Sequence, residues 1–375
     1  MTFRERLLNT LRGRPVDRLP FVELGPAPYL LVRLFSDWNE HLAPEDDPRK
    51  VFGFDNLGAG KGYKAVPLDQ FAVPRFPERA VHSDDKYERK FIPQWGCVAR
   101  HAVVDKDSPF PSRVLEGHAI RSRDDWLNAR DTHFRLTTNG RFPENWSDWC
   151  AQNRHASVPI ALQVPEPEDG VWNLLGDEGE TGLFEGFHSN PELIAEIAEH
   201  LSRLYLMCIE KALAEAPVDM VIVNGSDLWP FAGPRTMKEF FFPFYEKVIG
   251  LARNAGVDLI CLSTRIVMKR DWIDLFVNAG VNGVRIVEMT GDSRLVRDVI
   301  AHYGNRLFYI GNMDGRILTR DERAITAEVR RGIAEARTLR AVPCLASDHI
   351  LPDVPYAHYR HYIDTLREEV FGPAQ

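Results

Sequence analysis

The sequence of 375 residues lacks a surplus of positive charge. Its 46 lysine and arginine residues are outnumbered by 54 aspartate and glutamate residues, which gives a formal net charge of −8 at pH 7. Nucleic-acid binding depends on a basic surface that neutralises phosphate groups. We therefore expect no nucleic-acid partner.

Long apolar runs are also missing. A membrane-spanning helix needs about 20 consecutive apolar residues. The N-terminal segment 1–15 mixes arginine and glutamate with apolar residues, where a signal peptide would carry an unbroken apolar stretch. The sequence predicts a cytoplasmic protein with no membrane association.

Cysteine is scarce, and its spacing matches no familiar metal site. The five cysteines are odd in number, far apart and without a CxxC pair. They are Cys97, Cys150, Cys208, Cys261 and Cys344. We expect most of them to be reduced, buried thiols.

What the chain does have, after residue 157, is a regular alternation of short apolar runs and amphipathic segments. This alternation is typical of parallel strands joined by helices. The predicted strands are 160–164, 220–223, 259–262, 284–287, 307–310 and 342–345. The predicted helices are 191–216, 235–255, 269–279, 292–303, 320–340 and 356–370.

Two further strands, 18–25 and 51–55, are predicted after a short entry helix at 2–12. Eight strands with helical returns and no polar linker favour a single (β/α)8 TIM barrel over residues 1–375, rather than a doubly wound sheet.

Segment 58–157 breaks this rhythm between the second and third strands. It predicts an insertion made of a β-hairpin, at 87–92 and 97–104, followed by helices near 124–129 and 146–153. Four tryptophans expected to be exposed allow either a lid over the barrel mouth or a subunit interface in a homodimer. They are Trp95, Trp126, Trp146 and Trp149.

Polar residues follow almost every predicted strand. Barrel enzymes carry their sites at the carboxyl ends of the strands, and converging acids, arginines and histidine suit acid–base work on a small molecule. Any one of these residues could instead cap a helix. The candidates are Glu23, Asp55, Asn224, Asp227, Arg265, Arg285, Glu288, Asn312, Asp314, Asp348 and His349.

Several segments resemble the uroporphyrinogen decarboxylase superfamily, which includes the corrinoid-linked methyltransferases. They are Arg12–Pro20, Gly186–Glu192, Asp227–Pro243, Tyr309–Asp314 and Ser347–Pro355. The resemblance spans nearly the whole chain and implies a TIM barrel, with Asp55 at the place of the family's catalytic aspartate.

The resemblance also has gaps. The family's arginine-rich segment after the first strand is replaced by Glu23–Pro28, which contains no arginine, so we do not expect uroporphyrinogen III as substrate. The methyltransferases' zinc motif is replaced by Cys261–Arg265. We therefore expect no zinc and no other tightly bound cofactor, with a rearranged site of Cys261, Cys344 and His349 as the alternative.

Three functions remain open. The first is methyl transfer from a small methylated metabolite to a corrinoid, a corrinoid protein or tetrahydrofolate, with Asp227, Glu288 and Asp348 orienting the substrate and His349 handling protons. The second is a decarboxylase or related lyase, in which Arg265 and Arg285 hold a small carboxylate and Asp55 or His349 protonates the carbanion. The third is a degenerate member that binds a ligand without turnover.

Overall fold

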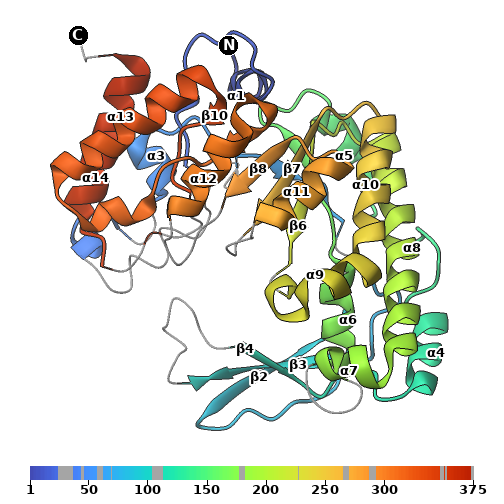
Figure 1. The fold of residues 1–375 in the computed structure, drawn as a ribbon. Coiled ribbons are helices and arrows are strands. Elements are labelled where there is room, and N and C mark those ends of the chain that lie inside the picture. The colour runs from blue at the N-terminus through green and yellow to red at the C-terminus, as the bar shows by residue number, and fades with distance from the viewer. Residues whose placement is uncertain are drawn as a thin grey trace.

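The fold is built around one parallel sheet of seven strands, in the order β1-β5-β6-β7-β8-β9-β10 (Figure 1). The computed structural model describes residues 1–23, 37–43, 46–56, 62–68, 70–103, 113–176, 182–226, 228–264, 270–286, 293–346, 350 and 353–372. The strands are β1 (Lys64–Ala65), β5 (Ile160–Gln163), β6 (Met220–Gly225), β7 (Leu259–Thr264), β8 (Gly283–Ile286), β9 (Phe308–Ile310) and β10 (Arg340–Val342). Every neighbouring pair is parallel. Within the described residues the sheet is curled like part of a TIM barrel but is not the closed eight-stranded barrel that we predicted.

The two predicted N-terminal strands account for the difference. The described part of 18–25 carries no strand, and the segment predicted as strand 51–55 begins instead as the end of helix α3 (Pro48–Phe52). The Asp47 side chain caps α3, Pro48 starts it and Gly53, at φ 65°, ends it, and these local signals outweigh the apolar run. The two segments still lie side by side, because the Asp55 amide donates to the Phe21 carbonyl at 2.8 Å.

The strands predicted after residue 157 are confirmed, apart from the last. The sequence predicted 342–345, whereas β10 ends at Val342 and only a single bridge joins Leu345 to Met313. Proline at position 343 has no amide hydrogen to donate to the ladder, and this interrupts the strand.

The helices predicted after residue 190 are also confirmed. They are α8 (Pro191–Glu215), α9 (Trp229–Phe240), α10 (Phe242–Asn254), α11 (Arg270–Ala279), α12 (Ser293–Tyr303), α13 (Glu322–Thr338) and α14 (Tyr356–Phe371). α9 and α10 replace one predicted helix. Two more helices, α6 (Pro167–Leu175) and α7 (Leu183–Ser189), were not predicted.

The insertion forms a small antiparallel sheet with the order β2 (Tyr87–Ile92), β3 (Cys97–Ala102) and β4 (Arg113–Glu116). The predicted hairpin is thus confirmed and gains a third strand, while β1, inside the segment assigned to the insertion, belongs to the main sheet. The small sheet lies on the same side of the main sheet as α6, α7 and α9 (Figure 1). It is joined to α6 where the Ile120 amide donates to the Leu174 carbonyl at 3.2 Å.

The helices of the insertion are α4 (Arg123–Thr132) and α5 (Trp146–Asn153), close to their predicted positions. Their tryptophans are not exposed as expected, since Trp126 is fully buried and Trp146 is 6% exposed. Trp126 packs against the rings of Phe134 and His200, and Trp146 stacks on Trp149. Trp126 thus packs the insertion against α8, which carries His200, and Trp146 also donates a hydrogen bond to Glu215 of α8.

The inner side of the main sheet encloses an apolar core. Helix α1 (Phe3–Leu11), predicted from the sequence, covers its amino-terminal end with Leu7, Leu8 and Leu11. The other members of this core come from β5, β6, β7, β9 and β10 and from segments outside the strands: Val22, Tyr63, Ala161, Met220, Ile222, Leu259, Cys261, Phe308, Ile310, Val342 and Cys344. Glycine is required at position 283, because a Cβ atom there would collide with the Phe308 ring.

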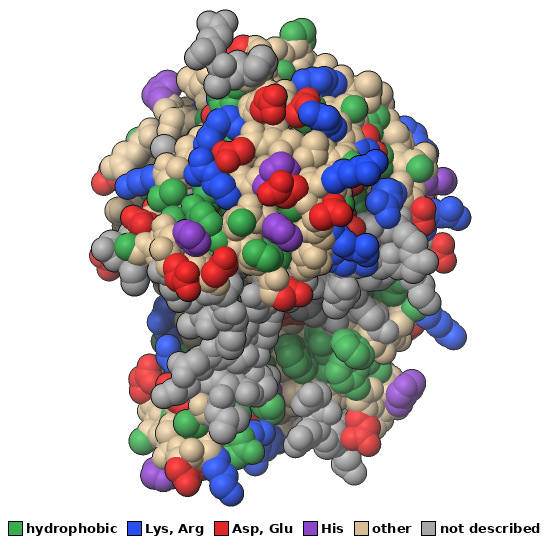
Figure 2. All heavy atoms as spheres, turned by 90° about the vertical axis from the view of Figure 1, so that its left-hand side faces the viewer, with side chains coloured by type: hydrophobic (Ala, Val, Ile, Leu, Met, Phe, Trp, Pro, Cys, Tyr) green, Lys and Arg blue, Asp and Glu red, His purple; other side chains and the backbone are tan. Residues whose placement is uncertain are grey.

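The surface is mixed in charge on the face drawn in Figure 2. Basic and acidic side chains are interspersed over its upper part, and hydrophobic side chains gather in a recess below. No helix in the described part of the chain is both long enough and apolar enough to cross a membrane.

Candidate functional site

Three polar side chains stand next to one another at the carboxyl ends of β6, β7 and β8. Asn224 is in register with Ser263, and Ser263 with Arg285. Asn224 follows Ile222 by two residues, and Ser263 follows Cys261 by two. Because alternate residues of a strand share a face, and Ile222 and Cys261 belong to the inner core, this row points to the inside of the sheet. We call Asn224, Ser263 and Arg285 the inner polar row.

Arg285 is the most unusual member of this row, since only 7% of it is exposed. Its guanidinium lies near two inner thiols. Burial raises the pKa of Cys261 to about 12 and that of Cys344 well above the ordinary range, and Arg285 partly opposes both increases. Both thiols are therefore protonated at neutral pH, and a buried cation stands beside them.

Glu23 lies buried close to the end of β10. Its side chain accepts hydrogen bonds from the Leu345 amide, at 3.4 Å, and from the Tyr362 hydroxyl of α14. Burial raises its pKa to about 7, although both hydrogen bonds act in the opposite direction. Glu23 is thus poised to exchange a proton near neutral pH, and it is close enough to Cys344 to raise the pKa of that thiol.

Asp55 is held by cations rather than directed to the inner polar row. Arg18 donates to both of its oxygens, at 2.6 and 2.7 Å, and Arg6 lies 3.5 Å away. The Phe21 backbone amide also donates a hydrogen bond to the Asp55 carboxylate at 3.0 Å. The geometry ties the segment around Asp55 to the N-terminal loop, and a catalytic role for Asp55 stays a prediction.

Asn312 and Asp314 face neighbouring helices. The Asn312 amide donates to the Gly332 carbonyl of α13 at 2.9 Å. Asp314 caps the 3-10 helix Gly315–Thr319 and pairs with Arg316 at 3.1 Å. The structure therefore does not bring these two residues together with the inner polar row.

The remaining predicted site residues lie outside the described residues. They are Asp227, Arg265, Glu288, Asp348 and His349. Their roles stay predictions. In the described part of the chain, no group of three histidine, cysteine or carboxylate side chains is arranged to hold a metal ion.

A buried acid on α6 was missed by the sequence analysis. Glu168 is fully buried and accepts hydrogen bonds from Trp229, at 2.7 Å, and from the Tyr245 hydroxyl, at 2.6 Å. Its other carboxylate oxygen has no hydrogen-bond partner among the described residues. Burial raises the pKa of Glu168 to about 7. The sequence offered two signals, which are the helix start at Glu166-Pro167 and a second acid, Asp169. In the structure the Asp169 carboxylate accepts a hydrogen bond from the Ser226 hydroxyl at 2.7 Å.

Among solved structures, the chain is similar to a methyltransferase from Methanosarcina mazei. The alignment covers 98% of this chain and 99% of the other, with a TM-score of 0.54 and 14% sequence identity. The chain has a methyltransferase-like fold. Xylanase B from Clostridium stercorarium F9 is a much weaker match, with a TM-score of 0.35, 13% identity and coverage of 60% of this chain and 85% of that one. No family model and no curated protein matches the sequence.

Proposed function

We propose that this chain is an enzyme that transfers a methyl group from a small methylated metabolite to a corrinoid, free or protein-bound, or to a pterin such as tetrahydrofolate. The observation that carries the proposal is the end-to-end likeness in fold to a methyltransferase. A barrel-like sheet with a polar inner row at its carboxyl ends is the usual place for such a site. Membership of the uroporphyrinogen decarboxylase superfamily is part of the same proposal.

Within this proposal the inner polar row binds the metabolite. Arg285 would pair with an anionic group, since a buried guanidinium favours a carboxylate partner. Asn224 and Ser263 would orient neighbouring polar atoms. Asp227, Glu288 and Asp348 would complete the orientation and His349 would move protons, as the sequence suggested.

No step of the proposed mechanism goes through a bound metal. Cys261 lies on β7 and Cys344 follows β10, and in the described part of the chain neither belongs to a group of three or more histidine, cysteine or carboxylate side chains that could hold a metal ion. The alternative of a zinc site completed by His349 stays a hypothesis. Elemental analysis of the purified protein, with about one zinc per chain as the positive result, tests it directly.

A second candidate function is favoured by the buried Arg285. A decarboxylase must hold a carboxylate in a position where carbon dioxide can leave, and Arg285, together with Arg265, is suited to that task. Asp55 or His349 would then protonate the carbanion. The first candidate has the fold likeness in addition, and we therefore prefer it.

A substrate panel distinguishes the candidates. The purified protein is incubated with methylated amines, thiols and ethers, with cob(I)alamin or tetrahydrofolate as acceptor, and separately with small carboxylic acids while carbon dioxide is measured. We expect methyl transfer from at least one donor. Carbon dioxide release without methyl transfer would favour the lyase, and ligand binding without either product would indicate the degenerate, non-catalytic member.

Replacement of Arg285 tests the role of the inner polar row. We expect Arg285→Lys to raise KM for an anionic substrate at least about tenfold, because a lysine keeps the charge but loses the paired donors. Steady-state kinetics and thermal unfolding are measured together, with the exposed Arg203→Ala on α8 as the control. Unchanged KM in a folded Arg285→Lys enzyme would remove Arg285 from the binding site.

A further inference from the structure

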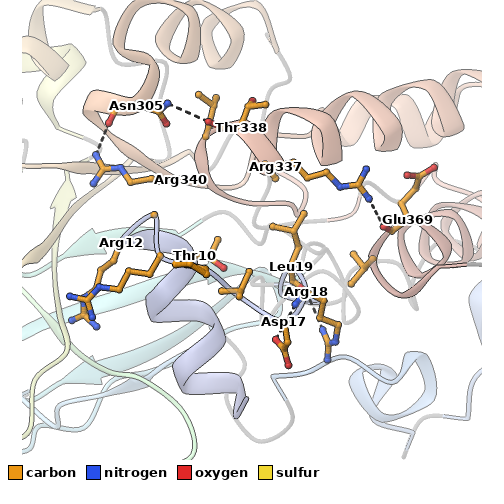
Figure 3. A pocket seen from close by; sticks show the side chains of 17 residues that line it. Thr10, Arg12, Asp17, Arg18, Leu19, Asn305, Arg337, Thr338, Arg340 and Glu369 are labelled. Carbon is orange, nitrogen blue, oxygen red and sulfur yellow. Dashed lines mark hydrogen bonds between the residues drawn. The ribbon is translucent and has the colours of Figure 1, made fainter.

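A cavity lies at the opposite end of the strands from the inner polar row. It has a volume of about 700 Å³ and is formed by the loop after α1, the turns that precede β9 and β10, and the end of α14 (Figure 3). We call it the basic groove. Its lining is Thr10, Arg12, Gly13, Arg14, Pro15, Val16, Asp17, Arg18, Leu19, Asn305, Ala336, Arg337, Thr338, Leu339, Arg340, Glu369 and Val370.

The basic groove concentrates positive charge in a chain whose net charge is negative. Five arginines line it, against two carboxylates. Both carboxylates are paired with cations from outside the lining: Asp17 with Arg6 at 2.8 Å and Glu369 with Arg330 at 3.2 Å. The arginines are therefore not neutralised by the acids beside them.

Two of the five arginines are engaged with carboxylates elsewhere. Arg12 binds Asp258 through two hydrogen bonds of 2.8 and 2.7 Å, and Arg18 binds Asp55 in the same manner. These pairs fix the positions of the two side chains. They leave Arg14, Arg337 and Arg340 to provide the excess charge.

These three guanidinium groups have unused donors. Among the described residues, the guanidinium groups of Arg337 and Arg340 donate through one nitrogen each, to backbone carbonyls: Arg337 to that of Glu369, and Arg340 to those of Asn305 and Arg306, at 2.9 Å in each case. In Figure 3, Arg340 and Arg337 both lie above Thr10 and Leu19, with Arg340 extending toward Asn305 and Arg337 toward Glu369. Within the described residues, the Arg14 side chain makes no ion pair or hydrogen bond. Each guanidinium has five N–H donors, so most of them are available to a ligand.

We propose that the basic groove binds a phosphorylated organic molecule of about nucleotide size. Guanidinium groups match the geometry of phosphate oxygens and bind them in pairs. The volume lies within the range of small-molecule sites, and Leu19, Leu339 and Val370 offer apolar surface to the organic part. Because the groove lies at the amino-terminal ends of the strands, this site is separate from the inner polar row and does not depend on the proposed function.

Titration calorimetry with the full chain tests the proposal. ATP, pyrophosphate and inorganic phosphate are the probes, each at 50 and 200 mM salt. We expect ATP to bind most tightly, and its binding to weaken as salt increases because the contacts are ionic. Pyrophosphate binding as tightly as ATP would overturn the assignment of an organic ligand, and no binding of any probe would overturn the site.

Matched variants assign the binding to the groove. Arg14→Ala and Arg337→Ala should each weaken ATP binding about tenfold, since a charge-assisted hydrogen bond contributes roughly that factor. Arg14→Ala removes no hydrogen bond or ion pair from the described residues, so we expect it to fold, and circular dichroism checks both variants. Arg203→Ala, on the exposed side of α8, should bind as the wild type does. Wild-type affinity in both groove variants would place the ligand elsewhere and refute the proposal.

Discussion

Replacing Arg141 with alanine is expected to destabilise the protein by roughly 3 to 5 kcal/mol, because several buried carbonyl groups would lose their donor. Arg141 is fully buried, and burial lowers its pKa. Its guanidinium donates to the Thr137 and Arg135 carbonyls at 2.7 Å and also to the Phe71 carbonyl. One side chain thus ties the segment after β1 to the loop after α4. Urea unfolding followed by circular dichroism measures the loss.

Two variants sharpen the test of Arg141. Arg141→Lys should be less damaging than alanine, because it keeps the charge but cannot reach all three carbonyls. Arg135→Ala, an exposed change in the same loop that leaves the backbone acceptor in place, should cost less than about 1 kcal/mol. A loss of similar size in Arg135→Ala and Arg141→Ala would mean that the loop itself, and not the buried guanidinium, is sensitive.

The second large effect concerns pH, and is expected from Glu168. Its pKa is about 7 in the folded protein and 4.5 is the ordinary value, so the folded state holds this proton more tightly than the unfolded state. The stability that this gives is fully present below pH 4.5 and is lost as pH rises to about 7. A difference of this size corresponds to about 3 kcal/mol. Glu168→Gln cannot ionise and should not show this loss.

Unfolding free energies at pH 5 and pH 8 measure the effect. The wild type should lose about 2.5 kcal/mol more than Glu168→Gln between these pH values, since part of the effect lies below pH 5. Glu199→Gln, an exposed acid on α8, is the control and should follow the wild type. Glu23, whose pKa is also about 7, contributes in the same direction in both proteins and so cancels from the comparison. Equal pH dependence in wild type and Glu168→Gln would show that folding does not raise the pKa of Glu168.

The parts of the fold that could be predicted are those with local signals. The Asn190 side chain and Pro191 mark the start of α8, and the period of apolar residues marks its length. The prediction of a strand at 51–55 was wrong because other local signals were overlooked. The capping signals at Asp47 and Gly53 favour a helix more strongly than a short apolar run favours a strand. α6 was missed because its buried acid, Glu168, interrupts the apolar pattern that would have revealed it.

The residues of the candidate site likewise include some that the sequence could indicate and some that it could not. Asn224 follows the predicted strand 220–223 and Arg285 lies within the predicted strand 284–287, so both could be singled out, and the register of the sheet does bring them into one row with Ser263. The pairing of Asp55 with Arg18 and Arg6 joins segments 37 and 49 residues apart, and no sequence pattern signals it. The basic groove draws its lining from several separate segments, so only the folded chain assembles it.

The glycine at position 283 has a consequence for how the inside of the curled sheet is filled. It lets the Phe308 ring lie across the inside of the curled sheet, above the leucines of α1. The Phe308 ring and the leucines of α1 belong to one buried apolar cluster, so packed side chains fill this end of the sheet's interior. Because α1 contributes leucines to this cluster and Thr10 to the basic groove, a displacement of α1 would be transmitted to the inner face of the strands.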